Sequence, residues 1–375
     1  MQSVWPSNTP EGLAFTPAFA LKPETPIIFL GLISPARNGV VQPLISQQTQ
    51  ACLLNLEDTL AAVGSNAKPV KVTRFMRDVR EVWTSQQEFD RHFGASNPAS
   101  TLIEVPTCSH PDVRIELEVW TAATIIGVSQ EARTMGDNGI PLAIATDPRA
   151  NLAFINGVAG DAAGTGAVAE LNACLDDIGN RLSAAGGLAG SIVKLSLYLV
   201  DMRLWSTIRA ALLARYGRWI PVLVPVAVHK VQQEGASIEA DATVVVPPAT
   251  AKDASDVART GVDRGLLVLS GAAALPLYVG GKAQDAYYYQ PEPSAAAQTT
   301  ISLRNLEIVL RTAGSNWADV FKTTWYISDI REWPQIREAA HAVLGRPPPN
   351  PSVIEVSKLV LPAVRVEADI WAMLR

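Results

Sequence analysis

Hydrophobic residues predict three amphipathic helices at regular distances along the chain. Apolar side chains recur every three or four positions in residues 48–63, where Leu53 and Leu56 follow this spacing, and again in 167–185 and 295–313. This period places the apolar residues on one face of a helix. Each predicted helix ends at or beside a glycine, which adopts the left-handed C-cap conformation at little cost. The glycines are Gly64, Gly186 and Gly314.

Runs of β-branched and aromatic residues predict strands around each of these helices. One short run precedes the helix, as at 26–30 and 266–270. A longer run follows it, at 70–76, 192–200 and 320–327. A second helix is predicted to begin near Trp83, Trp205 and Trp333. Two further strands follow, first at 98–105, 221–228 and 349–356, and then at 113–119, 236–242 and 364–370.

Four residue types recur in one fixed phase, which shows that this pattern is a repeat. The intervals between the copies are 123 and then 128 residues for a lysine, an aspartate, an arginine and a glutamate. The recurring residues are Lys71, Lys194 and Lys322; Asp78, Asp201 and Asp329; Arg80, Arg203 and Arg331; and Glu116, Glu239 and Glu367. A long fixed period indicates one copied structural unit, and about 125 residues is an ordinary domain size. We predict three repeats, at 1–123, 124–247 and 248–375.

Each repeat is predicted to be a ββαβαββ unit of the α+β class, with two helices on one face of a sheet. The other face of the sheet also needs cover. Three sheets that face inward around a pseudo-threefold axis would bury these faces, giving an intramolecular pseudo-trimer that needs no second chain. The contacts between neighbouring repeats are then the expected places for functional sites.

Composition narrows the class of function. Hydrophobic residues make up 48% and charged residues 18% of the chain, and the net charge is −5. This balance fits a globular protein, and the absence of basic runs argues against nucleic acid as a partner. We find no apolar stretch long enough to span a membrane and no signal peptide at the start. The three cysteines, Cys52, Cys108 and Cys174, lack zinc-site spacing and suit buried free thiols in a reducing cytoplasm.

The third repeat resembles the RidA (YjgF/L-PSP) family over nearly its whole length. The resemblance is carried by Ser270-Gly271, Gln298-Thr299, the segment 313–329, Ile354-Glu355-Val356 and the segment 366–372. Repeat 1 matches through shorter pieces, among them Gln48-Thr49, Asn55-Leu56 and Glu116-Leu-Glu118. Repeat 2 is the most diverged, because Glu170 and Asp177 stand where the other copies have Gln and Asn.

The resemblance implies a chorismate-mutase-like fold, a trimer-like assembly, and clefts between neighbouring units. Members of the family hydrolyse reactive enamines and imines. In the family pattern an arginine at the start of the penultimate strand grips the substrate carboxylate, and a glutamate on the last strand places or protonates the attacking water. This chain departs from that pattern, since the arginine position holds Ser100, Leu223 and Pro351. None of these side chains can make a bidentate contact with a carboxylate.

The three last-strand glutamates, Glu116, Glu239 and Glu367, are the candidate catalytic residues. A carboxyl group in a partly desolvated cleft has a raised pKa, which suits a general acid or base near neutral pH. The structural alternative is that these glutamates lie on a polar sheet face or pair with the repeated lysines of neighbouring strands.

Several small polar residues are candidates for substrate binding. Ser270 and Gly271 would let a ligand approach the backbone, where a hydroxyl and an amide stabilise negative charge. Ser100, Thr101 and Ser352 lie at or beside the missing arginine and would hydrogen-bond a neutral ligand. The alternatives are a strand glycine at a bulge and hydroxyl groups satisfied by the backbone.

A long loop in the third repeat carries three consecutive tyrosines, Tyr287, Tyr288 and Tyr289. Functional loops are often of this kind, so the tyrosines are candidates for a lid over a cleft. The alternative is packing against the adjacent repeat. The repeated Asp-x-Arg triplets, by contrast, are predicted to be structural, forming turns and caps between a strand and a helix.

We expect an enzyme that acts on a small reactive enamine, imine or enol by glutamate acid–base chemistry of the hydrolase, deaminase, isomerase or cyclase type. No metal and no organic cofactor is predicted. Because the arginine is missing, the standard 2-imino-acid deaminase reaction is not expected. Two alternatives remain. One is a hydrolase similar to chorismatases, which are RidA-like pseudo-trimers. The other is a non-catalytic protein that binds a ligand or serves as a scaffold.

Overall fold

The computed structural model describes most of the three predicted repeats. The described residues are 2–4, 18–20, 27–62, 68–94, 98–122, 133–135, 141–146, 151–160, 162–184, 192–217, 221–246, 266–269, 271–275, 290–349 and 351–373.

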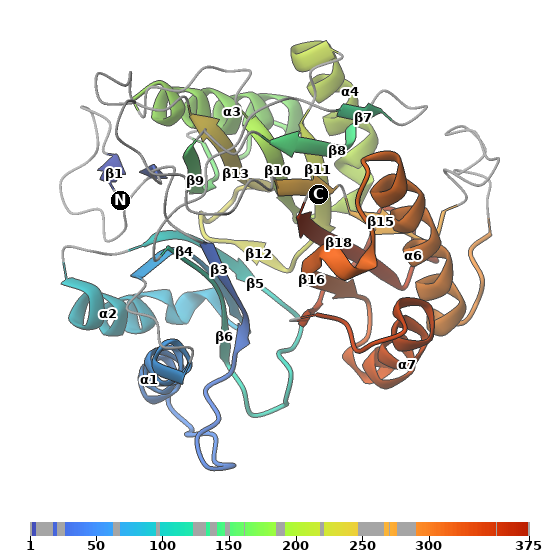
Figure 1. The fold of residues 1–375 in the computed structure, drawn as a ribbon. Helices are drawn as coiled ribbons and strands as arrows, with labels where there is room; N and C mark the ends of the chain where they lie inside the picture. Colours follow the sequence, from blue (N-terminus) through green and yellow to red (C-terminus); the bar gives the residue numbers. More distant parts are fainter. Residues whose placement is uncertain are drawn as a thin grey trace, which may run out of the picture.

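In each repeat the two helices and the strands that follow them come in the predicted order (Figure 1). In repeats 1 and 2, however, a single strand of the repeat's own sheet precedes the first helix, where two were predicted. Repeat 1 contains β3 (Ile27–Ile33), α1 (Ile45–Ala62), β4 (Lys68–Met76), η1 (Val79–Glu81), α2 (Val82–Phe93), β5 (Ala99–Glu104) and β6 (Ile115–Ala122). Repeat 2 contains β9 (Asn151–Val158), α3 (Ala167–Ala184), β10 (Ile192–Leu199), η4 (Met202–Leu204), α4 (Trp205–Tyr216), β11 (Val222–Ala227), β12 (Lys230–Val231) and β13 (Ile238–Val246). Repeat 3 contains β14 (Leu266–Leu269), β15 (Ala272–Ala273), α6 (Ala295–Thr312), η6 (Trp317–Asp319), β16 (Val320–Ile327), η7 (Ile330–Glu332), α7 (Trp333–Leu344), β17 (Pro351–Glu355) and β18 (Val366–Met373).

The three sheets share one central topology. In repeat 1, β4 pairs in parallel with β5 and antiparallel with β6, and β6 pairs antiparallel with β3. The corresponding strands of repeats 2 and 3 pair in the same directions. The α+β class and the threefold repetition predicted from the sequence are therefore confirmed.

Five short strands lie in the sheet of a repeat other than their own: β1 (Gln2–Val4), β2 (Ala18–Ala20), β7 (Arg133–Met135), β8 (Pro141–Thr146), and β12 of repeat 2, which pairs with β5 of repeat 1. Strand β2 belongs by sequence to repeat 1 but pairs with β9 in the sheet of repeat 2, and β1 pairs with β2. Strand β8 belongs by sequence to repeat 2 but pairs with β14 of repeat 3, and β7 pairs with β8. Two repeats thus give an outer strand to the next sheet, which the sequence did not predict.

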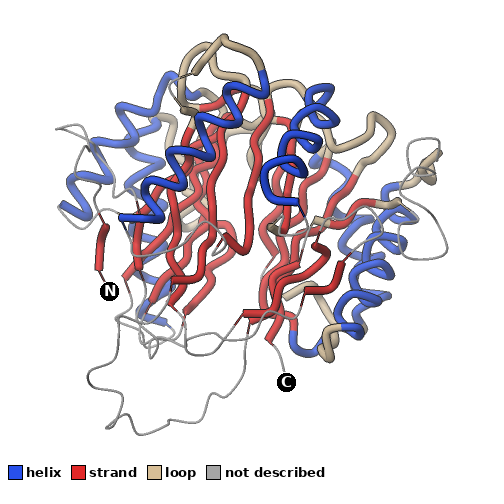
Figure 2. The backbone as a smooth tube through the Cα atoms, turned by 90° about the horizontal axis from the view of Figure 1, so that it is seen from above, coloured by secondary structure: helices blue, strands red, loops and turns tan. Residues whose placement is uncertain are grey.

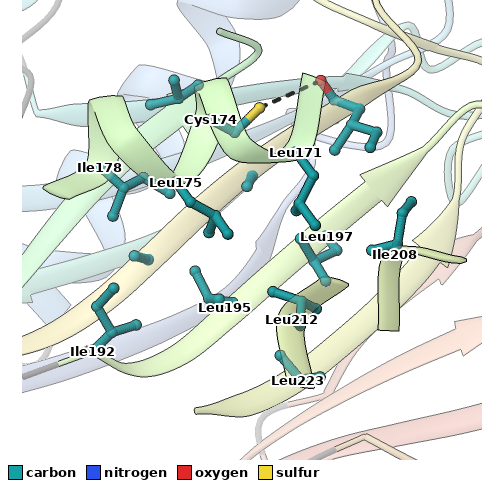
Figure 3. Packing of buried hydrophobic residues seen from close by; sticks show 14 of the residues in the cluster. Leu171, Cys174, Leu175, Ile178, Ile192, Leu195, Leu197, Ile208, Leu212 and Leu223 are labelled. Carbon is teal, nitrogen blue, oxygen red and sulfur yellow. Dashed lines mark hydrogen bonds between the residues drawn. The ribbon is translucent and has the colours of Figure 1, made fainter. Parts of the chain in front are cut away.

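The helices lie on the outside and the sheets toward the middle of the molecule (Figures 1 and 2). Each sheet buries one apolar face under its own two helices. In repeat 2, Leu171, Leu175 and Ile178 of α3 pack on Leu195 and Leu197 of β10 (Figure 3). Equivalent cores lie under the helices of repeats 1 and 3.

The inner faces of the three sheets pack on one another, as predicted for a pseudo-trimer. One inner cluster contains Phe75, Tyr198 and Tyr326, which occupy equivalent positions in repeats 1, 2 and 3. A second inner cluster contains Trp120 and Trp371 together with other residues of all three repeats. Side chains from three sheets meet in both clusters, so a pseudo-threefold axis runs between the sheets.

We call the contact between two neighbouring repeats a seam. At seam 1/2 the backbone N–H of His229 donates to the carbonyl of Glu104 at 3.0 Å. At seam 2/3 the equivalent N–H of Ser357 donates to Ala227 at 2.9 Å. At seam 3/1 the corresponding position is Pro106, which has no N–H to donate.

The Asp-x-Arg triplets form caps, as predicted. The carboxylates of Asp78, Asp201 and Asp329 each accept a hydrogen bond from the backbone N–H two residues later and from the arginine side chain. All three cysteines are free and buried, as predicted. Among the described residues, no helix is long and apolar enough to cross a membrane.

Candidate functional site

A belt of six charged side chains surrounds the pseudo-threefold axis. It consists of the repeated lysines and of the acidic residue two positions after each repeated glutamate. These residues, which we call the axial belt, are Lys71, Lys194, Lys322, Glu118, Asp241 and Asp369. They line a cavity of about 30 Å³, together with hydroxyl groups and aromatic rings from all three repeats. A cavity of this volume holds one or two water molecules, so it is not a substrate pocket.

The ion pairs of the belt run around the ring from each repeat to the next. The Nζ of Lys71 lies 2.5 Å from Oδ2 of Asp241, and the Nζ of Lys194 lies 2.5 Å from Oδ2 of Asp369. Lys322 closes the ring less tightly, 3.7 Å from Oε1 of Glu118 and 3.4 Å from Oδ2 of Asp369. The repeated lysines therefore pair with these acids, and the alternative that they pair with the candidate glutamates is wrong.

The candidate glutamates lie on the same inner sheet faces as the belt. Each stands two residues before the acidic belt residue of its strand, so that the two side chains are neighbours on one face. Glu116 pairs in register with Phe75, Glu239 with Tyr198, and Glu367 with Tyr326. Each of the three is at most 2% exposed. They are buried carboxyl groups without a salt-bridge partner within 4 Å among the described residues, and their environments differ.

Glu116 is held by two donors. Both the backbone N–H and the hydroxyl group of Ser109 hydrogen-bond its carboxylate, the N–H at 3.0 Å. Burial raises the pKa of Glu116, while the bonds from Ser109 oppose this rise. A carboxylate whose oxygens are both bonded in this way is better suited to fixing a loop than to proton transfer.

Glu239 lies at seam 1/2, in contact with the backbone of Gly157. Its Oε2 accepts a hydrogen bond from the N–H of Gln232 at 3.0 Å. A Cβ atom on Gly157 would lie 1.9 Å from Oε1 of Glu239 and 3.1 Å from Cγ2 of Thr101 in repeat 1. Burial raises the pKa of Glu239 to about 7.

Glu367 lies at seam 2/3 and has the least hydrogen-bond support. Its Oε2 has no hydrogen-bond partner among the described residues. A Cβ atom on Gly271 would lie 2.0 Å from its Oε1, so the glycine makes room for the carboxyl group. Burial, with a smaller contribution from the charge of Asp369, raises the pKa of Glu367 to about 8. This side chain is therefore a carboxylic acid at neutral pH.

The predicted binding residues fall into different environments. Ser100 pairs in register with Val72, which belongs to the outer core, the apolar cluster between the sheet of repeat 1 and its helices. The buried Oγ of Ser100 has no hydrogen-bond partner among the described residues. The hydroxyl of Thr101 donates to Oδ2 of Asp241 at 2.9 Å and so supports the axial belt instead of a ligand. Ser352 is fully buried, and its Oγ also lacks a described partner.

Gly271 is the predicted binding residue that the structure places against a candidate glutamate. Its N–H, however, points to the carbonyl of Leu223 in repeat 2, at 3.4 Å. Leu223 itself, at the position of the family arginine, packs in the outer core of repeat 2. Ser270 and the tyrosines Tyr287, Tyr288 and Tyr289 lie outside the described residues.

The raised pKa values predict that stability falls as the pH rises. Glu239 and Glu367 hold their protons in the folded state up to pKa values of about 7 and 8, whereas an unfolded glutamate loses its proton near pH 4.5. Between these values the folded state binds more protons, so the free energy of unfolding decreases with pH, by no more than about 1.4 kcal/mol per pH unit for each proton. Urea denaturation from pH 5 to 9 should show this decrease, and the double variant Glu239→Gln/Glu367→Gln should flatten it. An equally steep decrease in that variant would contradict the assignment.

Comparison with known proteins supports the resemblance found in the sequence. The family model described as "Endoribonuclease L-PSP" matches residues 20–123 and 261–374, which fall in repeats 1 and 3. The mitochondrial protein mmf1 of Schizosaccharomyces pombe is 30% identical over 122 residues, which cover 32% of this chain and 75% of that protein. A RutC family protein of Pyrococcus horikoshii is 32% identical over 87 residues, covering 23% of this chain and 68% of that protein. Since mmf1 is named as mitochondrial, the cytoplasmic location of this chain stays a prediction.

Two solved structures show partial similarity to this chain. A YjgF-family protein of Mycobacterium tuberculosis is 30% identical and covers 31% of this chain and 82% of its own, with a TM-score of 0.24. A chorismatase covers 93% of this chain and 99% of its own, at 13% identity and a TM-score of 0.49. The family model covers more than half of this chain in two separate copies. The protein therefore belongs to the endoribonuclease L-PSP family, which is the RidA/YjgF family that its third repeat resembles.

Proposed function

We propose that the protein is an enzyme in which Glu367, at the seam between repeats 2 and 3, is the general acid for a small neutral enamine, imine or enol. The observation that carries this proposal is the state of the Glu367 side chain. It is a buried carboxyl group with one unpartnered oxygen, and its pKa of about 8 leaves it protonated at neutral pH. Protonation of an enamine or enol carbon, or of an imine nitrogen, requires such a donor.

The charges around Glu367 favour a neutral substrate. The family arginine is replaced at this seam by Leu223, whose side chain packs into the core of repeat 2. Lys194 is the belt lysine whose positive charge lowers the pKa of Glu367. It is already paired with Asp369, with Nζ 2.5 Å from Oδ2. A substrate carboxylate would meet the negative charge of Asp369, whose cation Lys194 is already paired with it, and this would oppose binding of the substrate.

The three glutamates are proposed to differ in function. Glu116 is satisfied by Ser109, and Glu239 by Gln232 on one oxygen. A homotrimer repeats one site three times, whereas a fused chain lets each seam change separately. We therefore assign the proton donor to one seam, with the other two seams mainly holding the ring together.

Replacing Glu367 with glutamine is expected to lower kcat/KM about 100-fold or more on a responsive substrate, since general acid catalysis contributes about 10²–10⁴-fold. Glutamine keeps the size of the side chain and removes the transferable proton. The assay compares neutral enamines and imines with their carboxylate analogues and measures ammonia or carbonyl release. Glu116→Gln serves as the matched control and should keep most of the activity.

Two results would reject this proposal. Equal rates in the wild type and in Glu367→Gln would show that Glu367 is not the proton donor. A preference for carboxylate analogues would show that the substrate is not neutral. Pyruvate release from chorismate, lost in Glu367→Gln, would instead support the chorismatase-like alternative. A chain that binds these compounds without turning them over would support the non-catalytic one.

A further inference from the structure

The structure places a second carboxylate beside the candidate acid, on the same strand face. Glu367 and Asp369 are two residues apart on β18, and alternate residues of a strand point to the same side. Opposite them on β16 lie Tyr326 and Thr324. The two acidic side chains are 2% and 1% exposed, so little water separates their charges. Their backbones are about 6.7 Å apart at the usual rise of a strand.

Asp369 carries the charge of this pair. Its Oδ2 lies 2.5 Å from the Nζ of Lys194 and 3.4 Å from the Nζ of Lys322. Burial opposes ionisation of Asp369, but the charges of Lys194 and Lys322 outweigh it and lower the pKa of this carboxyl group. Its Oδ1 has no hydrogen-bond partner among the described residues.

The groups near Glu367 stabilise its charged form less than Lys194 and Lys322 stabilise the charged form of Asp369. The titratable and charged groups around it are Asp369 on its own strand, Tyr326 on β16 and Lys194 on β10. Tyr326 is neutral, since burial raises its pKa well above the ordinary value. Besides Lys194, repeat 2 contributes the backbone carbonyl of Leu223, which accepts a hydrogen bond from Gly271, the glycine in contact with Glu367.

We propose that Asp369 is a positioning residue for the candidate acid: its negative charge, fixed by two lysines of the axial belt, adds to the effect of burial in keeping the proton on Glu367. This inference rests on the proposed function and gives the axial belt a part in it. Lys194 then has two opposing effects. It holds Asp369 in place and ionised, and its own positive charge partly offsets the effect of Asp369 on Glu367.

Substitution of Asp369 by asparagine tests the proposal directly. The titration midpoint of Glu367 is followed by NMR of ¹³C-labelled glutamate carboxyl groups, with the signal assigned by its loss in Glu367→Gln. In Asp369→Asn the midpoint should fall by about one to two pH units, the effect of one charge ~7 Å away at an effective dielectric constant of about 20. The alkaline limb of the kcat/KM profile should move by the same amount.

Asp241→Asn is the matched control, because Asp241 occupies the equivalent position at seam 1/2 and pairs with Lys71. It should leave the midpoint of Glu367 unchanged. The proposal is overturned if Asp369→Asn leaves this midpoint unchanged, or if Asp241→Asn shifts it as far. A shift of the midpoint in a protein without turnover would reject the proposed reaction but retain the role of Asp369.

Lys194→Met provides a second measurement, which decides the matter if Asp369→Asn does not fold. Lys322 remains within 3.4 Å of Asp369 in this variant and preserves its charge. Removal of the opposing positive charge should therefore raise the midpoint of Glu367. An unchanged or lowered midpoint would overturn the proposal.

Discussion

Replacement of Lys71 by methionine is expected to lower the free energy of unfolding by about 3–5 kcal/mol, the usual cost of leaving a buried charge without its partner. The Lys71 and Asp241 side chains are only 7% and 4% exposed. After the substitution, the hydroxyl groups of Thr101 and Tyr198, at 2.9 and 3.3 Å, would remain beside Asp241. These groups donate hydrogen bonds but carry no compensating charge. Urea denaturation at pH 7 measures the loss.

The geometry of the belt predicts that the lysines are not equivalent. Lys194→Met should cost less than Lys71→Met, because Lys322 also contacts Asp369. Methionine in place of Arg203 is the exposed control. Its side chain is 87% exposed in the pair with Asp201, and exposed pairs of this kind contribute little to stability. The double variant Lys71→Met/Asp241→Leu should recover most of the loss. Equal losses for Lys71→Met and Arg203→Met would contradict the buried belt.

Substitution of Gly271 by alanine is expected to lower kcat/KM by about 100-fold or more and also to destabilise the fold by about 1–3 kcal/mol. The new Cβ would lie 2.0 Å from Oε1 and 3.0 Å from Cδ of Glu367, too close for the carboxyl group to stay in place. A displacement of about 1 Å at a reacting group is enough for a rate loss of this size. Turnover and urea denaturation of the same preparation separate the two effects.

Gly157→Ala is the matched control for this prediction. Its Cβ would meet Oε1 of Glu239 at 1.9 Å, so the steric conflict is the same at another seam. It should destabilise the protein to a similar extent and leave kcat/KM largely intact if Glu367 is the proton donor. The opposite outcome, with turnover lost in Gly157→Ala and kept in Gly271→Ala, would move the assignment to Glu239.

The sequence predicted the elements well because the repeat gave three independent examples of each pattern. The apolar spacing at 48–63 predicted α1, which spans Ile45–Ala62, and the run at 320–327 predicted β16 with its observed bounds. The inward-facing sheets also followed from the sequence, since each sheet needs cover on both faces. The repeated Asp-x-Arg triplets indicated the observed caps, because aspartate commonly accepts a hydrogen bond from the backbone two residues later.

Features that depend on contacts between repeats were not predictable in this way. The partners of Lys71 and Lys194 lie in the neighbouring repeat, so no local spacing in the sequence connects the two members of each pair. Alternation on the last strand was the available signal, since Glu116 and Glu118, or Glu367 and Asp369, face the same side. The pairing of β2 and β8 with the sheet of the next repeat corresponds to no repeated pattern in the sequence. The burial of Arg74 was not predictable either. Its side chain is 1% exposed, with Cζ 4.9 Å from the centre of the Phe89 ring. The equivalent positions in repeats 2 and 3 hold Leu197 and Trp325.

The cyclic order of the ion pairs has a consequence for how such a protein changes over generations. Each repeat gives its lysine to one neighbour and receives the lysine of the other on its own acidic residue, as Lys71 with Asp241 and Lys194 with Asp369 show. In an assembly of three identical chains, one codon change would alter all three of these bonds at once. Here the same change alters one bond and leaves its two counterparts to hold the structure, so selection can explore one junction while the others stay fixed.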